Sequence, residues 1–385
     1  MAMTEAERGE DQLSAFDAFG EEFGSHEDPL ETFDHQFKQV DADPINIYCE
    51  SVIMKENNTQ KYNRERVLAI NDWVDHMNQY DRHAACPSVS HMIEYINKEI
   101  KTGNLPGTIL KKLSTFENMF EYWSNHPKMP HGFGEAEGFN PVVSAYALTK
   151  EDIRANEKSE KKRPHPISIE ELGHEIRNVK NILHRAFIVC QLKHGLRAGQ
   201  AGNIQIQDVK LNHKELNNLY PDLGTHPKLS DIDDDAIYYP HFSEREGGKS
   251  KRPIVLPIDD ELKRLLVRYL RQRPPVEQPW MFLNPATCKR ISTNYASKRF
   301  WKAAFHPKYS ETEMYRPVTS HYGRHRFNTY WKKEIDIKSE YLKYIRGDLQ
   351  GDMDSNSQDV IYTYIHTYYS DIRDKYLKDI FQFNI

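Results

Sequence analysis

SHYGRHRFNTYW, residues 320–331, is the stretch that decides the fold of this chain. His321 and Arg324 are three residues apart, so on a helix their side chains share one face and can reach a single anionic group. The planar guanidinium of arginine carries paired donors that match the oxygens of a phosphate. An isolated pair of this kind is more often part of a solvated helix surface, so the rest of the chain has to decide between the two interpretations.

Composition limits the classes of protein to which the chain can belong. With 385 residues, 38% of them hydrophobic and 28% charged, it is long enough for two or three domains with their own cores. Its four cysteines form no C-x-x-C pair, which argues against a zinc ribbon, a redox motif or a secreted disulfide framework. No apolar run approaches the roughly 20 residues that span a bilayer. We expect a soluble cytoplasmic protein that does not bind membranes.

The net charge of −5 is divided unevenly along the chain. Residues 1–35 contain eleven Asp and Glu residues and one Arg, a net charge of −10, so the remainder carries +5. The acidic head therefore masks a mildly basic body. We interpret residues 1–41 as an acidic arm that is disordered or transiently helical. It is either a solubilising tail or an interaction or autoinhibitory arm, because a negative segment can occupy a DNA-binding groove by charge alone.

The remaining chain divides into two domains joined by a linker. Residues 42–147 show helical periodicity and predict a four- or five-helix domain that ends near residues 139–141. Residues 148–166 are charged and end in prolines, as is typical of an exposed linker. We expect residues 167–385 to be a second domain.

The second domain is predicted to be mainly helical with a small antiparallel sheet, an α+β fold. Two strands are expected at residues 236–239 and 254–257, with a turn at 246–250. Helices are expected on both sides of this hairpin, including residues 182–196 and 321–331.

Three segments occur in an order that carries more information than any one of them. FIVCQLKHGLRAGQAGNIQIQDVKL (187–211) places Arg197 after an apolar helix, with Asp208 eleven residues later. REGGKSKRPIVLPID (245–259) places Lys249 on the hairpin, and the histidine–arginine segment follows. This order resembles the tyrosine recombinases, the phage-integrase-like family of site-specific DNA recombinases, over about residues 62–381. The helical residues 42–147 are similar, more weakly, to the DNA-binding core-binding domain of that family.

The resemblance implies a catalytic role for Arg197, Lys249, His321 and Arg324, with Lys251 as the alternative lysine. The nucleophile lies in YTYIHTYYSDIRDKYLKDIF (362–381). Tyr364 stands in the family's Tyr-x-His pattern. In the part of the family's pattern that follows the histidine, Ile372 and Tyr376 occupy the expected positions. Tyr362 fits the part of the pattern that precedes the tyrosine better.

Four positions depart from the family's pattern. Gln200 replaces a glutamate, and residues 349–358 are an insertion. Gly323 replaces a leucine, which we expect to loosen local packing. Asp348, in YLKYIRGD, stands where the family has histidine or tryptophan, so that role is either absent or supplied by Arg346 or His366.

These residues suit phosphodiester cleavage without a metal or other cofactor, since no acidic or His/Cys cluster resembles a metal site. Two arginines can neutralise the non-bridging oxygens, and their charge favours the tyrosine phenolate, whose reference pKa is about 10. A lysine on a hairpin suits a general acid for the 5′-hydroxyl leaving group. The expected product is a 3′-phosphotyrosine, which conserves the bond energy for rejoining and makes ATP unnecessary.

The resemblance implies DNA integration or excision at specific double-stranded attachment sites by a homo-tetramer on two duplexes. A mobile element such as an archaeal virus or plasmid is the expected carrier. Two alternatives stay open: a type IB topoisomerase, and a catalytically inactive DNA-binding regulator. The C-terminal residues 377–385 are expected either to dock on a neighbouring subunit or to pack as a terminal helix.

Overall fold

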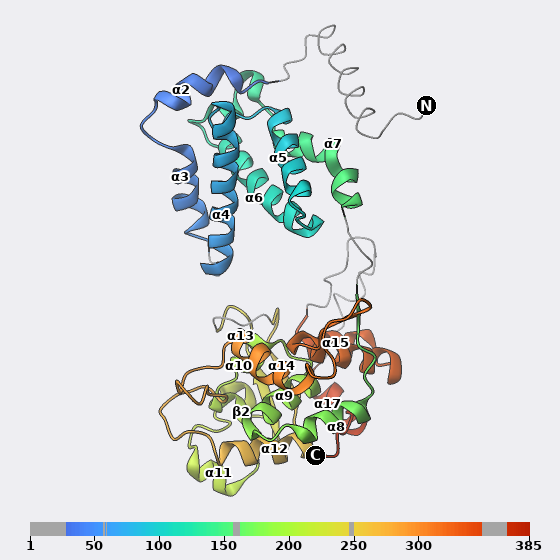
Figure 1. Cartoon of the computed structure of the whole chain (residues 1–385). Helices are drawn as coiled ribbons and strands as arrows, with labels where there is room; N and C mark the ends of the chain where they lie inside the picture. The colour runs from blue at the N-terminus through green and yellow to red at the C-terminus, as the bar shows by residue number, and fades with distance from the viewer. Residues whose placement is uncertain (1–27, 57, 59, 157–161, 246–249, 349–367) are drawn as a thin grey trace, which may run out of the picture. The chain divides into compact units, whose positions relative to one another are not determined.

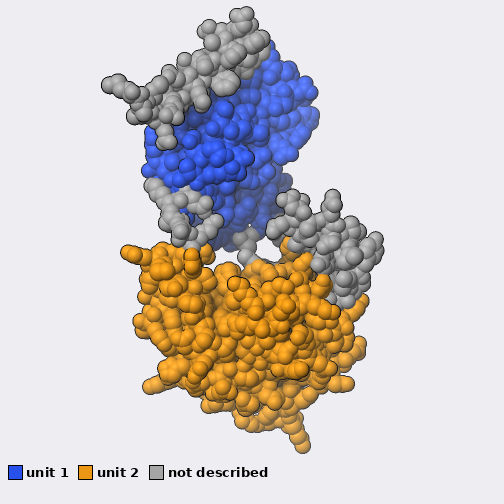
Figure 2. Space-filling model, turned by 90° about the vertical axis from the view of Figure 1, so that its right-hand side faces the viewer, with its two compact units in different colours: residues 1–160 blue, residues 161–385 orange. Residues whose placement is uncertain are grey.

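The structure, a computed structural model, describes residues 28–56, 58, 60–156, 162–245, 250–348 and 368–385. The chain forms two units, Met1–Glu160 and Lys161–Ile385, each with its own hydrophobic core (Figures 1 and 2). No helix among the described residues has the length and apolar character needed to cross a bilayer.

The first unit is helical, and its core is built from the aromatic stripes that the sequence predicts. Trp73, Tyr95 and Phe116 are fully buried, and the rings of Trp73 and Phe116 both pack against the ring of Tyr95. The helices are α2 (Asp34–Gln39), α3 (Pro44–Tyr48) with a π-helical turn at Cys49–Ile53, α4 (Gln60–Met77), α5 (Val89–Lys101), α6 (Pro106–Ser124) and α7 (Pro141–Ala155).

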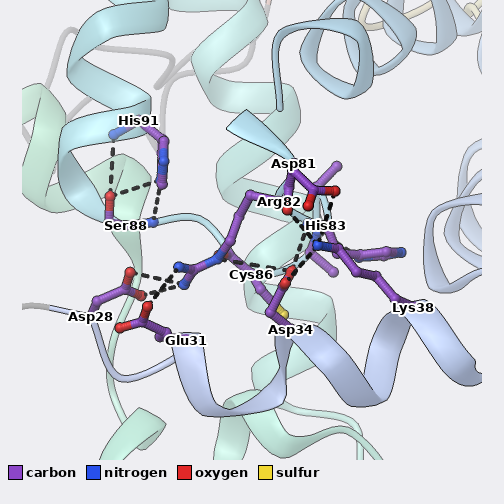
Figure 3. Close-up of polar contacts among 12 residues, drawn as sticks. Asp28, Glu31, Asp34, Lys38, Asp81, Arg82, His83, Cys86, Ser88 and His91 are labelled. Carbon is purple, nitrogen blue, oxygen red and sulfur yellow. Dashed lines mark hydrogen bonds and ion pairs between the residues drawn. The ribbon is translucent and has the colours of Figure 1, made fainter. Parts of the chain in front are cut away.

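The start of the described chain differs from the predicted disordered arm. Leu30 is only 1% exposed, and the short helix α2 follows it. Two carboxylates fix this segment to the loop after α4: Asp28 lies 2.7 Å from the Arg82 guanidinium, and Asp34 accepts the backbone N–H of His83 at 2.7 Å (Figure 3). A buried leucine and these ionic contacts order residues 28–39, although their local sequence is acidic and weakly periodic.

The predicted linker is also partly structured. Helix α7 begins at Pro141 and continues to Ala155, well past the predicted domain end, with Thr149 and Ile153 buried in the first unit. The exposed residues near the end of this helix include Glu151, Asp152 and Arg154, which is why the composition there looks like that of a linker.

The second unit is built around α9 (Ile182–His194), in which every residue from Leu183 to His194 is buried apart from His184 and Arg185. A helix that is apolar on every side belongs in a core, and α12 and α15 pack against it (Figure 1). The helices around it are α8 (Ile169–Asn178), α10 (Ala198–Gly202), α11 (Lys214–Leu219), α12 (Asp260–Leu270), α13 (Thr293–Tyr295), a π-helical turn Ala296–Trp301 continuing into α14 (Lys302–Phe305), α15 (Ser320–Thr329), α16 (Ser339–Arg346) and α17 (Tyr369–Asp379).

The predicted hairpin strands are confirmed. β3 (Ala236–Tyr239) and β4 (Ile254–Pro257) pair antiparallel with Ile237 opposite Leu256, and β2 (Val209–Lys210) extends the sheet on the other side of β3. A separate parallel pair joins β1 (Arg163–Pro164) to β5 (Tyr315–Arg316). The mainly helical α+β fold expected from the sequence is therefore correct.

The C-terminal segment packs on its own unit. Phe381 and Phe383 are buried, and the carboxylate of Glu261 accepts the backbone N–H of Phe383 at 3.1 Å. The fully buried ammonium of Lys193 lies 2.8 Å from Glu261 and donates to the carbonyl of Phe381 at 3.0 Å. Residues 377–385 therefore pack on their own unit, but the expected terminal helix is only partly right, because α17 ends at Asp379 and the residues after it are not helical.

The expectation that Gly323 loosens the packing is wrong. A Cβ atom built on Gly323 would lie 2.9 Å from Cη2 of Trp301, a fully buried side chain. The indole N–H of Trp301 donates to Oε1 of Gln191 on α9 at 2.7 Å, which fixes the ring in place. Trp301 thus fills the space that a larger side chain at residue 323 would occupy.

We expect Gly323→Ala to lower the free energy of unfolding by about 1–3 kcal/mol, because the added methyl group forces the Trp301 ring to shift. Denaturant unfolding of the full chain, followed by tryptophan fluorescence, measures this. Gly107→Ala is the matched control: it adds the same methyl group to a helix, but no atom lies within 4 Å of the added Cβ. In a Trp301→Leu background the cost of Gly323→Ala should shrink. An equal cost in both backgrounds would contradict the assigned contact.

Candidate active site

Arg197 is positioned by a sharp turn at the end of the central helix. Gly195 caps α9 with a positive φ of 61°, and the ring of Phe327 occupies the space where a Cβ would be. The chain then starts α10 with half-buried Arg197 at its N-cap. Oε1 of Gln200 accepts the Arg197 backbone N–H at 3.0 Å. Gln200, a departure from the family's glutamate, therefore still supports this turn.

Arg324 projects from α15 into the protein and is held there by backbone carbonyls. Its side chain is buried, and Nη1 donates to the carbonyl of Gly195 at 3.0 Å. Nη2 lies 3.5 Å from both the carbonyl of Arg346 and Oδ1 of Asp348. Burial, together with the charges of Arg197 and Arg346, lowers the pKa of Arg324 to about 10, so the guanidinium stays protonated at neutral pH.

His321 lies one turn before Arg324 on α15. Its side chain is exposed, but the surrounding protein still removes part of its hydration. This desolvation, followed by the charges of His325, Arg197 and Arg324, keeps the pKa of His321 below its usual value. The ring packs edge-on against His325, with 4.5 Å between the ring centres. The imidazole is therefore accessible to solvent, and these surroundings favour its neutral form.

Asp348 and Arg346 complete the set of charged groups around Arg324. Helix α16 ends at Arg346, Gly347 takes a positive φ of 68°, and Asp348 follows. Nε of Arg346 lies 2.8 Å from Oδ2 of Asp348. One carboxylate thus contacts two guanidinium groups, those of Arg346 and Arg324.

The chain on both sides of the predicted lysine is anchored near this site. Before it, Arg245 donates to the fully buried carboxylate of Asp208 at 3.0 Å. After it, Ser250 accepts a hydrogen bond from Gln200 at 3.4 Å, and the Lys251 backbone N–H donates to the Gly347 carbonyl at 2.8 Å. Asp208, which was predicted only from its spacing to Arg197, therefore holds one arm of the hairpin.

Two predicted catalytic residues lie outside the described residues: Lys249 and Tyr364. The alternative nucleophile Tyr362 and the histidine His366 lie outside them too. The alternative lysine, Lys251, is described and is exposed.

The two residues that the family's pattern places after the nucleophilic tyrosine, Ile372 and Tyr376, lie on α17. Ile372 and Tyr376 are each 1% exposed, and the hydroxyl of Tyr376 donates to the carbonyl of Lys193 at 2.8 Å. These two residues are therefore core residues.

The structure thus brings Arg197, His321 and Arg324 together, along with Arg346 and Asp348. Sequence reasoning missed Ser250, whose buried hydroxyl lies between Gln200 and Gly347. It also missed Arg245, because pairing with Asp208 is a contact between distant segments. Among the described residues, no group of three or more His, Cys, Asp or Glu side chains is arranged to hold a metal ion.

Comparison with known proteins gives a family and a fold. Residues 165–339 match the model of the phage integrase family. The sequence matches no curated protein.

Several solved structures share the fold. A lambda integrase dimer bound to a core site matches with a TM-score of 0.53 and 14% identity over 95% of this chain and 86% of that chain. The Tn1549 transposon integrase bound to transposon right-end DNA matches with a TM-score of 0.51 and 14% identity, over 86% and 98% of the two chains. The XerH recombinase bound to its difH substrate matches with a TM-score of 0.51 and 12% identity, over 86% and 92%. Residues 165–339 therefore match the phage integrase family, and the chain shares its fold with these integrase and recombinase structures.

Proposed function

We propose that this protein is a site-specific DNA recombinase that cleaves and rejoins DNA through a 3′-phosphotyrosine intermediate. The observation that carries the proposal is the convergence of Arg197, His321 and Arg324 from two segments more than a hundred residues apart. The phage integrase family domain and the likeness to integrase and recombinase structures support it.

The arginines have the geometry and charge to bind a phosphodiester. Arg324 is held by carbonyl oxygens and keeps its charge, so little reorganisation is needed when a phosphate arrives. Arg197 lies close enough for its charge to lower the pKa values of both Arg324 and His321. Together these groups can neutralise the negative charge that develops on the non-bridging oxygens.

The remaining chemistry is assigned to Tyr364 and Lys249. The Tyr364 oxygen attacks phosphorus, the bond to the 5′-oxygen breaks, and Lys249 transfers a proton to that oxygen. The new phosphotyrosine bond conserves the energy of the phosphodiester, so attack by a different 5′-hydroxyl completes strand exchange without ATP.

DNA is the proposed partner. Lambda integrase has been solved as a dimer on a core site and as a tetramer on a Holliday junction. By this likeness we propose that the chain acts in the cytoplasm on specific double-stranded attachment sites, as a homo-tetramer on two duplexes. An archaeal virus or plasmid as the carrier stays a prediction from the sequence.

We expect wild-type protein to form a covalent adduct with nicked DNA whose short fragment diffuses away after cleavage. A pool of nicked duplexes with a randomised core removes the need to know the site. The adduct, detected on a denaturing gel, should be lost in Tyr364→Phe and retained in Tyr362→Phe. The reverse pattern would assign the nucleophile to Tyr362. An absence of adduct with wild-type protein would contradict the enzyme and favour a DNA-binding regulator, whereas sequence-independent relaxation of plasmids would favour a topoisomerase.

The role of Lys249 has its own test. Lys249→Ala should slow cleavage of ordinary DNA by about 100-fold or more, within the usual contribution of a general acid. DNA with a bridging 5′-sulfur at the cleaved bond has a leaving group that needs no proton, so Lys249→Ala should cleave it nearly as fast as wild type. Lys251→Ala is the matched control and should behave as wild type on both substrates. If Lys251→Ala shows the substrate-dependent loss instead, the general acid is Lys251.

The charged groups around His321 lead to a separate prediction about its pKa. Because Arg197 lowers the pKa of His321, Arg197→Ala should raise it. The pKa of His325 is lowered by partial burial, Arg316 and Arg324, so it should change less. NMR titration of the histidine rings measures both values. Equal shifts, or no shift at His321, would contradict the proximity of Arg197 to His321.

A further inference from the structure

The end of α16 and the two residues after it bring three groups to Arg324, and only one of them is explained by the site described above. The Arg346 carbonyl is an acceptor for Arg324. The other two are the Asp348 carboxylate and the Arg346 guanidinium, which form an ion pair with each other. A second guanidinium this close to a buried one is unfavourable unless an anion offsets it.

The arrangement leaves an excess of positive charge that fits an anion. Arg197, Arg324 and Arg346 carry three positive charges, and Asp348 supplies one negative charge between two of them. The site therefore keeps a net charge of about +2 before any ligand binds. A phosphodiester that gains charge during cleavage is the anion that this excess suits.

Arg346 differs from Arg324 in being accessible. Its side chain is 33% exposed, compared with 5% for Arg324. Asp348 lies 2.8 Å from Nε of Arg346 as an ion pair, although the contact lacks the geometry of a hydrogen bond. An arginine paired with one carboxylate still has further N–H donors for a ligand.

The backbone at this point is fixed by close packing. A Cβ on Gly347 would lie 2.2 Å from the hydroxyl oxygen of Ser250, and the Gly347 carbonyl accepts the Lys251 backbone N–H. The end of α16 is thus fastened to the segment that follows Lys249 and leads into β4. Arg346 is therefore held at the site and not on a free surface turn.

We propose that Arg346 is a third phosphate-binding arginine of this site, and that Asp348 is the positioning residue that orients it. The inference rests on the proposed recombinase function and deepens it. The Arg346–Asp348 pair is neutral overall, so it adds N–H donors without adding net charge. A carboxylate such as that of Asp348 has no N–H to donate to a phosphate, and Arg346 supplies the N–H donors instead.

The test compares cleavage of ordinary DNA with cleavage of DNA bearing a neutral methylphosphonate at the cleaved position. Arg346→Ala should slow adduct formation on ordinary DNA by ~100-fold, the usual effect of removing one donor to a developing oxyanion. Its DNA affinity should change little. On methylphosphonate DNA, Arg346→Ala and wild type should differ much less, because a methyl group replaces an anionic oxygen that would accept hydrogen bonds from Arg346. An equal defect on both substrates would mean that Arg346 acts only by supporting the structure, and would overturn the proposal.

The control is Arg271→Ala, which breaks another arginine–carboxylate pair, with Glu215, on the surface of the same unit. It should match wild type on both substrates. Arg346→Lys serves if the alanine variant does not fold: it keeps the charge, loses the fork, and should be slowed on ordinary DNA only. Wild-type protein that forms no adduct would overturn the proposed function. A normal rate in a folded Arg346→Ala or Arg346→Lys variant would overturn this inference alone.

Asp348 is tested by a double-mutant comparison. Asp348→Asn should slow cleavage of ordinary DNA, because Arg346 loses its orientation. In the Arg346→Ala background, Asp348→Asn should add little further loss, since the residue it positions is absent. Losses that multiply in the double variant would show that Asp348 acts independently of Arg346 and would overturn its positioning role.

Discussion

The candidate active site depends on one buried guanidinium. Arg324 has a charge that must be solvated by the protein, and the carbonyl of Gly195 is its best-aligned acceptor. That carbonyl is available because Gly195 adopts a left-handed conformation at the end of α9 and turns the chain toward Arg197. The same turn therefore fixes both arginines.

The packing around α15 follows from this constraint. Arg324 can enter the core only if α15 lies close against α9. Gly323 permits that approach, since it leaves room for Trp301, which is hydrogen-bonded to Gln191 of α9. On the other side, α16 contributes the Arg346 carbonyl and is fastened to the hairpin through Gly347. The hairpin is held in turn by Arg245 and Asp208. The residues expected to bind phosphate and the flanks of Lys249 thus belong to one connected framework.

Local patterns in the sequence predicted the elements that local forces determine. The strands of the hairpin and the apolar central helix are examples, because each is marked by periodicity or by turn residues. Arg197, His321 and Arg324 were found from motif order, and the structure places them together.

The rest depends on contacts between distant segments, which periodicity does not encode. Residues 28–39 were read as disordered or transiently helical because their order comes from contacts with distant residues such as Arg82. Helix α7 was cut short because its last residues are mostly charged. Gly323 was misread because its partner, Trp301, is 22 residues away. The C-terminal segment had two open roles until Lys193 and Glu261 showed where it packs.

The central claim is tested most directly by a crystal structure of the Tyr364→Phe protein bound to an uncleaved DNA duplex. The duplex is first chosen by its ability to form the covalent adduct with wild-type protein. The measured quantities are the distances from the non-bridging oxygens of the target phosphate to the guanidinium nitrogens of Arg197 and Arg324. The account predicts charge-assisted hydrogen bonds of about 2.7–2.9 Å from both, with Arg324 still donating to the Gly195 carbonyl. A phosphate bound away from these two arginines, or an Arg324 turned out of its buried position, would contradict it.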